Sequence, residues 1–253
     1  MNNTCLVTII TVVYNGEKYL EQTINSVINQ TYKNIEYIII DGGSTDQTLN
    51  IIKNYQDNIT YWISEKDEGL YDAMNKGIKL AHGELIGMIN SDDWYELDTV
   101  ETMVKSYIEY PKKSIFHANR FDIDENEKRT LKKFHPSNFK FKYYAMTYHH
   151  PSMFITKEEY NKHLYNINLA ALSDYQFVLE TFLQDTNAMH YLNKAVVNYR
   201  LDGVSASRSL FQGLKEGYIA RKNANMPFYK RLFAFIFGMT ISYIFSIKKL
   251  LSL

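Results

Sequence analysis

The stretch Ile86-Gly87-Met88-Ile89-Asn90-Ser91-Asp92-Asp93-Trp94 decides the fold that we predict for this chain. Its apolar half is typical of a strand buried in a parallel sheet, because such strands are covered on both faces. Its polar half places Asp92 and Asp93 at the carboxyl end of that strand, where open α/β sheets bind ligands. Adjacent carboxylates there need a cation or a proton, and Mg²⁺ is commonly held by carboxylates together with substrate phosphates. The alternative is that Ser91, Asp92 or Asp93 only caps the helix that starts near Glu96.

Three earlier apolar runs, over residues 6–13, 35–40 and 60–63, also end in polar clusters. Apolar residues recur at helical spacing between the runs, and a helix predicted over 70–81 is expected to end with Gly83 as its C′ glycine. Strands and helices that alternate with short connections predict a parallel, doubly wound sheet with right-handed crossovers. In such a sheet the four polar clusters lie at one edge and line one crevice. This arrangement favours a nucleotide site over a series of unrelated helix caps.

The composition of the 253 residues fits one large domain, or one domain with an appended piece. Basic and acidic residues balance at 28 each, so no overall positive field indicates a nucleic-acid partner. The single cysteine, Cys5, excludes an intramolecular disulfide and favours a reducing compartment. The N-terminal residues have no basic segment ahead of the first apolar run, which therefore reads as a strand and not a signal peptide. We expect a cytoplasmic protein.

Four motifs, in this order, resemble those of the family 2 glycosyltransferases, which have the GT-A fold. The resemblance is strong over residues 4–95 and weak over 96–205, and it rests on Thr11-Val12-Val13-Tyr14-Asn15, Ile40-Asp41-Gly42-Gly43-Ser44-Thr45-Asp46, Asp67-Glu68-Gly69-Leu70-Tyr71-Asp72-Ala73-Met74-Asn75-Lys76-Gly77 and Asn90-Ser91-Asp92-Asp93. It implies an α/β protein with a Rossmann-like, mostly parallel sheet and a smaller acceptor-side region, to which the sequence adds a C-terminal apolar helix. The expected divisions are a nucleotide-sugar-binding half over 1–110, an acceptor-binding and catalytic-base half over 111–225, and a membrane-associating helix over 226–253.

The resemblance also implies a donor site. The turn over residues 11–15 would lie against the uracil and ribose of a nucleotide sugar, and Asp41 would accept a hydrogen bond from the base. The helix that contains Asp72 and Asn75 would approach the nucleoside and the diphosphate. The implied nucleotide-sugar-binding residues are Thr11, Val13, Asn15, Asp41, Asp72, Asn75 and Asp92.

The metal motif of the family, Asp-x-Asp, reads Asn90-Ser91-Asp92 in this chain. Asp92 is therefore the first candidate ligand for Mn²⁺ or Mg²⁺, and Asp93 stands beside it. A cation that bridges the diphosphate would stabilise the charge that develops on the leaving group. The chain departs from the family pattern at Asn90, which replaces the first acid, and at Gly42, where many relatives carry a second acid.

The second half must supply a base that takes the proton of the acceptor hydroxyl. Asp174 matches the second acid of the Glu-Asp pair that supplies this base in relatives, and Ser173 stands in place of the Glu. Without the resemblance, Asp174 would be interpreted as an acid in the first turn of a helix, where the helix dipole favours negative charge. Relatives invert the anomeric centre, which implies a single displacement. His149 and His150 are neighbours and would face opposite sides of a strand. We assign His150 to the acceptor side. Arg200, in a segment resembling a loop at the pocket, could approach the diphosphate, although a surface arginine is the commoner outcome.

The run from Leu232 to Ile247 carries no charge and is flanked by Lys230-Arg231 and Lys248-Lys249. It is a little shorter than the ~18 to 20 residues that span a bilayer. Basic flanks with aromatic ends suit a helix that lies in the membrane interface. The alternative is that it packs against the protein itself or a partner. The charged stretch 122–133 is expected to form a hairpin or a solvated loop.

Together these observations predict a metal-dependent, inverting hexosyltransferase. It would move a sugar from a UDP-sugar to a glycan or lipid-linked acceptor during cell-envelope glycan synthesis, at the inner face of the membrane. Nucleotidyl transfer is one alternative, although the first strand is followed by Tyr14-Asn15-Gly16 and not by a glycine-rich phosphate loop. The other alternative is a nucleotide-sugar-binding module without catalysis, which Asn90, Gly42 and Ser173 would explain.

Overall fold

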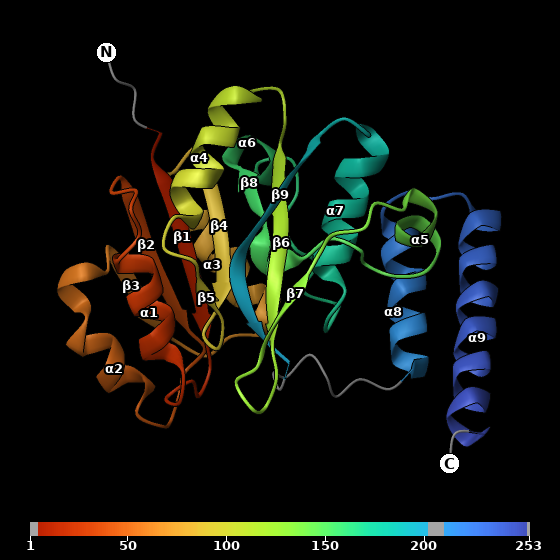
Figure 1. The fold of residues 1–253 in the computed structure, drawn as a ribbon, viewed down its shortest axis with the longest axis horizontal. Coiled ribbons are helices and arrows are strands. Elements are labelled where there is room, and N and C mark those ends of the chain that lie inside the picture. Colours follow the sequence, from red (N-terminus) through yellow and green to blue (C-terminus); the bar gives the residue numbers. More distant parts are fainter. Residues whose placement is uncertain (1–4, 202–209, 252–253) are drawn as a thin grey trace.

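The computed structural model describes residues 5–201 and 210–251, in which one sheet carries helices on both faces (Figure 1). The strand order is β3-β2-β1-β4-β8-β6-β9-β5, and β7 pairs with β6 outside this path. The strands are β1 Val7–Val13, β2 Ile35–Asp41, β3 Tyr61–Ser64, β4 Leu85–Asn90, β5 Trp94–Tyr95, β6 Ile115–Ile123, β7 Arg129–Lys132, β8 Phe154–Thr156 and β9 Met189–Arg200.

The first half is the parallel, doubly wound sheet that the sequence predicts. Strand β1 pairs in parallel with β2 on one side and β4 on the other, and β2 pairs in parallel with β3. The helices that return the chain between these strands are α1 Leu20–Ile28, α2 Thr48–Asn54, followed by the short 3₁₀ helix η1 Gln56–Asn58, and α3 Leu70–Leu80. The predicted order of strands and helices is therefore confirmed.

Every residue of β1 is buried, because helices cover both faces of the sheet. Neighbouring side chains on a strand point to opposite faces. Ile10 and Val12 accordingly join one hydrophobic cluster, which includes side chains of α3 and α7, whereas Ile9 and Val13 join the other, with side chains of α1 and α4. Burial on both faces explains why the run is apolar without alternation.

The second half continues the same sheet past residue 110. Strand β8 is antiparallel to both β4 and β6, and β9 runs parallel to β6. Strands β6 and β7 form an antiparallel hairpin, with Arg120 opposite Lys132, which confirms the hairpin reading of the charged stretch. The helices of this half are α4 Thr99–Glu109, α5 Asn138–Tyr143, η2 His150–Ser152, α6 Lys157–Tyr160, α7 Ser173–Gln184, α8 Leu210–Asn223 and α9 Phe228–Leu251.

Two local predictions are wrong. Gly83 does not end α3 as a left-handed glycine: the helix is capped at Ala81, and Gly83 is absent from the described glycines with positive φ. The position requires glycine because a Cβ atom there would collide with the backbone nitrogen of Thr8 in β1. Helix α4 starts at Thr99 with Asp98 before it, not near Glu96. None of the residues 91–93 therefore caps this helix, which removes the alternative reading of the two acids.

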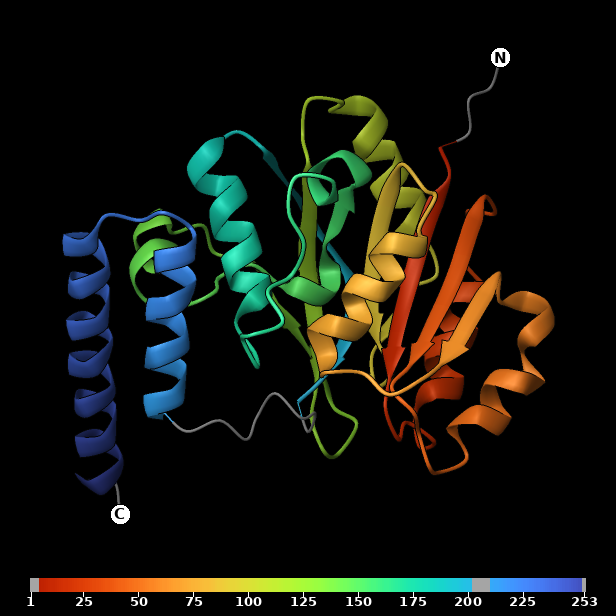
Figure 2. The same cartoon turned by 180° about the vertical axis from the view of Figure 1, so that it is seen from behind.

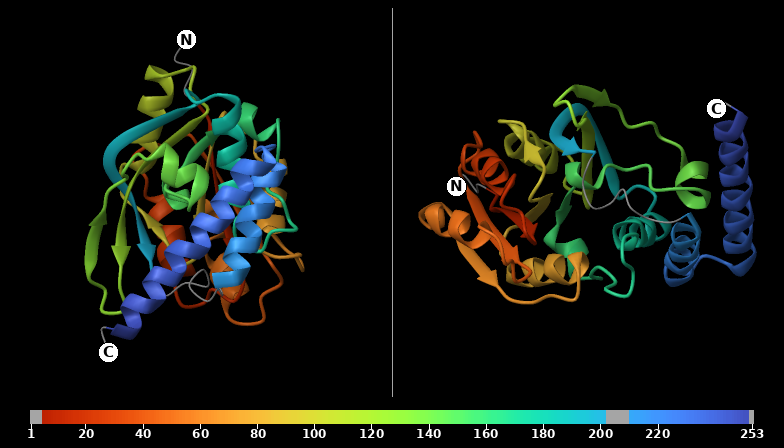
Figure 3. Two further views of the ribbon diagram at one scale, coloured as in Figure 1. Left: turned by 90° about the vertical axis from the view of Figure 1, so that its right-hand side faces the viewer. Right: turned by 90° about the horizontal axis from the view of Figure 1, so that it is seen from below.

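Helices α8 and α9 lie side by side at one end of the molecule, next to α5 (Figures 2 and 3). The rings of Phe233 and Phe237 in α9 contact Phe139 in α5. Another face of α9 leaves large apolar side chains exposed, among them Ile236 and Met239. Within residues 5–201 and 210–251, no helix combines the length and hydropathy needed to cross a bilayer.

Candidate active site

The carboxyl ends of β1 to β4 meet at one edge of the sheet, at the bottom of Figure 1. The register places Asp41 beside Val13 of β1 and Ser64 of β3, and it places Asn90 beside Val12. The predicted convergence of the polar clusters is confirmed.

A cavity of about 500 Å³ opens at this edge, and we call it the strand-tip cavity. Three of the predicted nucleotide-sugar-binding residues line it, namely Val13, Asn15 and Asp92. Asn15 has a φ of 50° and joins two loops, since its backbone N–H donates to Ser44 Oγ and its side-chain oxygen accepts from the N–H of Thr45. The full lining is Val12, Val13, Tyr14, Asn15, Gly16, Lys18, Tyr19, Asp67, Gly69, Leu70, Ala73, Asn90, Ser91, Asp92 and Tyr199.

Asp67 is a lining residue that sequence reasoning did not select as a site residue. Its carboxylate lies next to Gly42, where a Cβ atom would collide with Asp67 Oδ2. The loop after β3 thus brings an acid to the place where Gly42 carries none. The signals in the sequence were that Asp67 follows the third strand and opens the third of the four motifs.

The other predicted donor residues lie outside the lining of the strand-tip cavity. Thr11 is buried, and its hydroxyl is 3.0 Å from that of Tyr37. Asp41 is also buried, and its carboxylate accepts hydrogen bonds within its own loop and from the hydroxyl of Ser64, at 2.6 Å. Asp72 accepts from the N–H of Glu68 and pairs with Lys76 at 3.3 Å on the surface of α3. These carboxylates order the polypeptide around the cavity.

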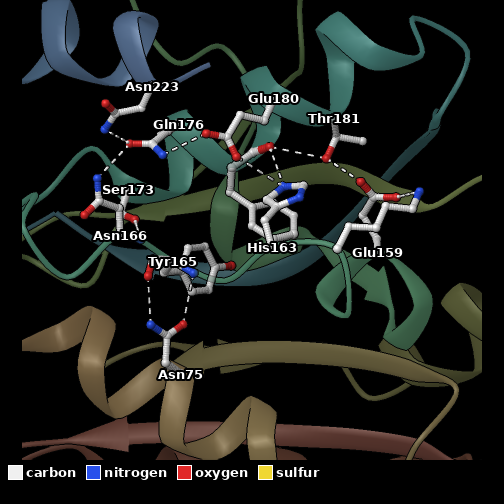
Figure 4. Close-up of polar contacts among 12 residues, drawn as sticks. Asn75, Glu159, His163, Tyr165, Asn166, Ser173, Gln176, Glu180, Thr181 and Asn223 are labelled. Carbon is white, nitrogen blue, oxygen red and sulfur yellow. Dashed lines mark hydrogen bonds and ion pairs between the residues drawn. The ribbon is translucent and has the colours of Figure 1, made fainter. Parts of the chain in front are cut away.

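Asn75 is buried, and it uses both ends of its amide on one partner. Its Nδ2 donates to the carbonyl oxygen of Tyr165 at 2.8 Å, and its Oδ1 accepts from the N–H of the same residue at 3.0 Å. Figure 4 shows this pair of bonds between α3 and the loop that precedes α7. The amide therefore holds that loop, and Asn75 does not line the strand-tip cavity.

The two adjacent acids face different surroundings. Asp92 lines the strand-tip cavity, whereas Asp93 is 1% exposed and accepts the backbone N–H of Arg200 at 3.0 Å. Burial, reinforced by the neighbouring charge of Asp92, raises the pKa of Asp93 well above its ordinary value. Of the two predicted ligands, Asp92 lines the strand-tip cavity, whereas the Asp93 side chain turns toward β9.

Arg200 is neither a surface arginine nor a lining residue. It is 5% exposed, its guanidinium pairs with Glu127 at 2.6 Å, and it lies 4.0 Å from the ring centre of Tyr19 and 4.8 Å from that of Trp94. Its neighbour Tyr199 does line the cavity. Residues 202–205 of the same predicted loop lie outside the described residues.

A second cavity, of about 690 Å³, adjoins the first, and we call it the hairpin cavity. The two share Leu70, Asn90 and Tyr199. The other lining residues are Tyr71, Met74, Arg120, Lys132, Lys133, His135, Lys140, Met146, Thr147, Tyr148, His149, His150, Pro151, Ala170, Ala171, Leu172, Asp174 and Gln212.

Asp174 and His150, predicted on different elements, line this second cavity together. Asp174 is in the first turn of α7, and its Oδ1 accepts the Tyr71 hydroxyl at 3.1 Å. His150 lies 3.1 Å from the hydroxyl of Tyr165, and burial lowers its pKa although the charge of Asp174 opposes this. The expectation that His149 and His150 are strand neighbours is wrong, because η2 begins at His150 and β8 only at Phe154; both histidines line the cavity.

A polar network fixes the start of α7 (Figure 4). The hydroxyl of Ser173 accepts the backbone N–H of Asn166 at 2.5 Å, and the side chain of Asn166 donates to Gln176 at 3.1 Å. Together with the Asn75 bonds to Tyr165, these contacts connect α3 to the first turn that carries Asp174. Ser173 is therefore a structural residue here.

The described residues around the strand tips do not by themselves form a complete metal site. No group of three or more histidine, cysteine, aspartate or glutamate side chains with metal-binding geometry occurs within the described part of the chain. Asp67 and Asp92, with the amide of Asn90, line one cavity. Such a set suits a hard divalent cation that completes its coordination with phosphate oxygens.

A family model described as Glycosyl transferase family 2 matches residues 8–165, which is more than half of the chain. The chain belongs to this family. It is 28% identical over 225 residues to a chondroitin synthase of Escherichia coli, covering 87% of this chain and 32% of that protein. The family 2 chain thus spans about a third of the length of this curated relative.

Solved structures show the same GT-A fold. The S. aureus TarS fragment 1–349 in complex with UDP-GlcNAc is similar with a TM-score of 0.70 and 17% identity, over 92% of this chain and 71% of that one. A mannosyltransferase from Pyrobaculum calidifontis in complex with GDP-Man and Mn²⁺ is similar with a TM-score of 0.68 and 14% identity, over 94% of this chain and 70% of that one. The predicted fold class is confirmed.

Proposed function

We propose that this protein transfers a sugar from a nucleoside diphosphate sugar, in particular a UDP-sugar, to a hydroxyl of a glycan or lipid-linked acceptor. The observation that carries the proposal is that two cavities meet at Leu70, Asn90 and Tyr199, with Asp92 lining one and Asp174 the other. A donor in the first cavity and an acceptor in the second would place the reacting atoms at their junction. Membership of family 2 supports this, as does the similar fold of TarS, which was solved in complex with UDP-GlcNAc.

The strand-tip cavity would hold the donor. Val13 and Asn15 would lie against the nucleoside. Asp41 and Asp72 would act indirectly, because their carboxylates accept hydrogen bonds from the loops after β2 and before α3. Asp92 and Asp67 would hold Mn²⁺ or Mg²⁺ together with the diphosphate. Bound there, the cation would neutralise negative charge on the departing nucleoside diphosphate.

Asp174 would act as the general base that removes the proton of the acceptor hydroxyl. It lines the acceptor-side cavity, and the Tyr71 hydroxyl, which donates to Oδ1, fixes its orientation while Oδ2 makes no hydrogen bond among those described. A single base opposite the leaving group fits a displacement with inversion, with no covalent intermediate. His150 lines the same cavity and would contact the acceptor there.

The first experiment measures sugar transfer and nucleoside diphosphate release with a panel of UDP- and GDP-sugars and Mn²⁺. Asp92→Ala should lose binding of UDP with Mn²⁺, and Asp174→Asn should keep that binding but lose transfer. Asp57→Ala, at an exposed acid outside both cavities, is the matched control and should retain both. Full transfer by Asp92→Ala and Asp174→Asn would remove the proposed roles. Release of pyrophosphate would indicate nucleotidyl transfer, and tight binding without turnover would indicate a module that only binds nucleotide sugars.

We also propose that α9 attaches the protein to the inner face of the cell membrane. Leu232, Ile236, Met239 and Tyr243 recur at helical spacing and are all exposed. Basic residues flank the uncharged run at both ends, which suits binding to anionic lipid. Ile236→Ser/Met239→Ser should reduce co-flotation with phosphatidylglycerol vesicles, whereas Leu97→Ser/Ile108→Ser, an equal change at exposed sites elsewhere, should not. Equal flotation of both variants would contradict the proposal.

A further inference from the structure

The walls of the hairpin cavity are positively charged although the chain as a whole is neutral. Four cationic side chains line it, against the single carboxylate of Asp174: Arg120, Lys132, Lys133 and Lys140. In the whole sequence, 28 basic residues balance 28 acidic ones. Positive charge thus gathers around one cavity, and a cleft lined mainly by one sign of charge raises the local concentration of oppositely charged molecules.

The adjoining strand-tip cavity has the opposite balance. Its lining contains Asp67 and Asp92 and only one cation, Lys18. A cation bound with the donor would offset these acids, so the donor side needs no further positive charge. The lysines of the hairpin cavity are therefore available to a different molecule, the acceptor.

Three of the four cations have no acidic partner within the described residues. Arg120 pairs with Asp122 at 2.6 Å and stacks 4.1 Å from the ring centre of Tyr199, so it is held at the junction of the cavities. Lys132, Lys133 and Lys140 are exposed, and no ion pair involves them in the described parts of the chain.

The positive charge acts inside the cavity. The pKa of His149 is lowered to about 4, first by burial and then by the charge of Arg120, and Lys132 adds to this effect. Lys132 ends β7 and Lys140 belongs to α5, so two separate elements direct cations to the same space. A row of lysines on one solvated strand would not give this convergence.

We propose that the hairpin cavity selects an anionic acceptor, one that carries a carboxylate or a phosphate on a sugar or polyol unit near the hydroxyl that receives the sugar. This inference rests on the proposed glycosyltransferase function and names the chemical class of its acceptor. The anionic group lies against Lys132, Lys133 and Lys140, and the reacting hydroxyl lies toward Asp174. Carboxylates and phosphates share the charge and the acceptor oxygens that lysine ammonium groups bind.

The test compares charged and uncharged forms of two soluble probes in direct binding to the full chain with UDP and Mn²⁺ present. Hyaluronan hexasaccharide and its methyl ester form the carboxylate arm, and oligo(glycerol phosphate) and oligoglycerol form the phosphate arm. One anionic probe should bind at least tenfold more tightly than its uncharged counterpart, a preference that added salt should weaken. The arm that shows the preference identifies the source of the negative charge.

The variant Lys132→Gln/Lys133→Gln/Lys140→Gln should bind that anionic probe roughly tenfold more weakly, because each exposed ion pair contributes about a twofold effect. The control, Lys33→Gln/Lys53→Gln/Lys128→Gln, makes the same change of charge at exposed sites outside both cavities and should bind like the original protein. Both variants should keep the melting temperature and the affinity for UDP.

Equal binding of the charged and uncharged forms, or equal weakening by both triple variants, would overturn the proposal. Binding of neither anionic probe while UDP still binds would also overturn it and would leave the transferase proposal standing. Failure of UDP and of every UDP- and GDP-sugar to bind would instead count against the proposed function itself.

Discussion

Replacing Asn75 by alanine tests whether this residue holds the loop before α7 or contacts the nucleotide. The substitution removes both partners of the Tyr165 backbone, and Tyr165 is buried. Each buried group left without a hydrogen bond costs about 1–3 kcal/mol. Alanine regains about 0.6 kcal/mol through its higher helix propensity. We therefore expect Asn75→Ala to lose about 3 kcal/mol of unfolding free energy.

Urea unfolding followed by circular dichroism measures this loss. Asn50→Ala is the matched control, because Asn50 also lies within a helix but is exposed, and among the described residues its side chain bonds only to that of Gln47. Its unfolding free energy should change by less than about 0.5 kcal/mol. The affinity of Asn75→Ala for UDP should be unchanged, while its turnover should fall, since the same loop positions the helix turn of Asp174.

A loss below about 1 kcal/mol in Asn75→Ala would refute the reasoning, since two unsatisfied buried groups cost more than that. Weakened UDP binding with unchanged stability would refute it as well. That second outcome would return Asn75 to the donor-binding role that the sequence predicts.

Three further predictions follow from the site and the core. Asp174→Asn should lower turnover by about 10²–10⁴-fold with an unchanged Kd for UDP, because only proton removal is lost; a weaker UDP complex would place Asp174 at the donor instead. Burial, as the main cause, lowers the pKa of His117 to about 3 and that of His149 to about 4, so between these values and 6.5 the unfolded chain binds more protons than the folded one. The free energy of unfolding should thus be highest above about pH 6.5 and decline as the pH falls toward 4. His117→Gln should make this decline shallower, as measured by urea titrations at several pH values. Burial, aided by Glu84, raises the pKa of Cys5 to about 11, so N-ethylmaleimide at neutral pH should label this thiol only after denaturation; rapid labelling of the native protein would contradict its burial.

The local sequence was sufficient for the parallel half of the sheet. Runs such as Val7–Val13 and Ile35–Asp41 are apolar without alternation, and the helices between them carry apolar residues at helical spacing. These periodicities are properties of short segments, so they can be read without knowing the partners. The charged stretch 122–133 has no such periodicity, so the sequence left a hairpin and a solvated loop open, and the start of α4 and the role of Gly83 were predicted wrongly.

The direction of individual site side chains could not be read in this way. Asp92 and Asp93 are adjacent in sequence, yet one lines the strand-tip cavity and the other accepts the backbone of Arg200, far along the chain. Gly42 lacks a side chain, and the acid next to it comes from Asp67 on another loop. In each case the deciding partner is distant in sequence, and nothing local indicates it.

The sequence by itself determined the order of strands and helices, the edge at which their polar ends gather and the family to which those motifs belong. Tertiary structure alone decided that Asn75 holds the backbone of Tyr165 and that Lys132 and Lys140 face one cavity with Asp174. The physical reason is that helix and strand periodicity is set by neighbouring residues. The partner of a buried polar group, and the charge that a cavity accumulates, depend on segments that only folding brings together.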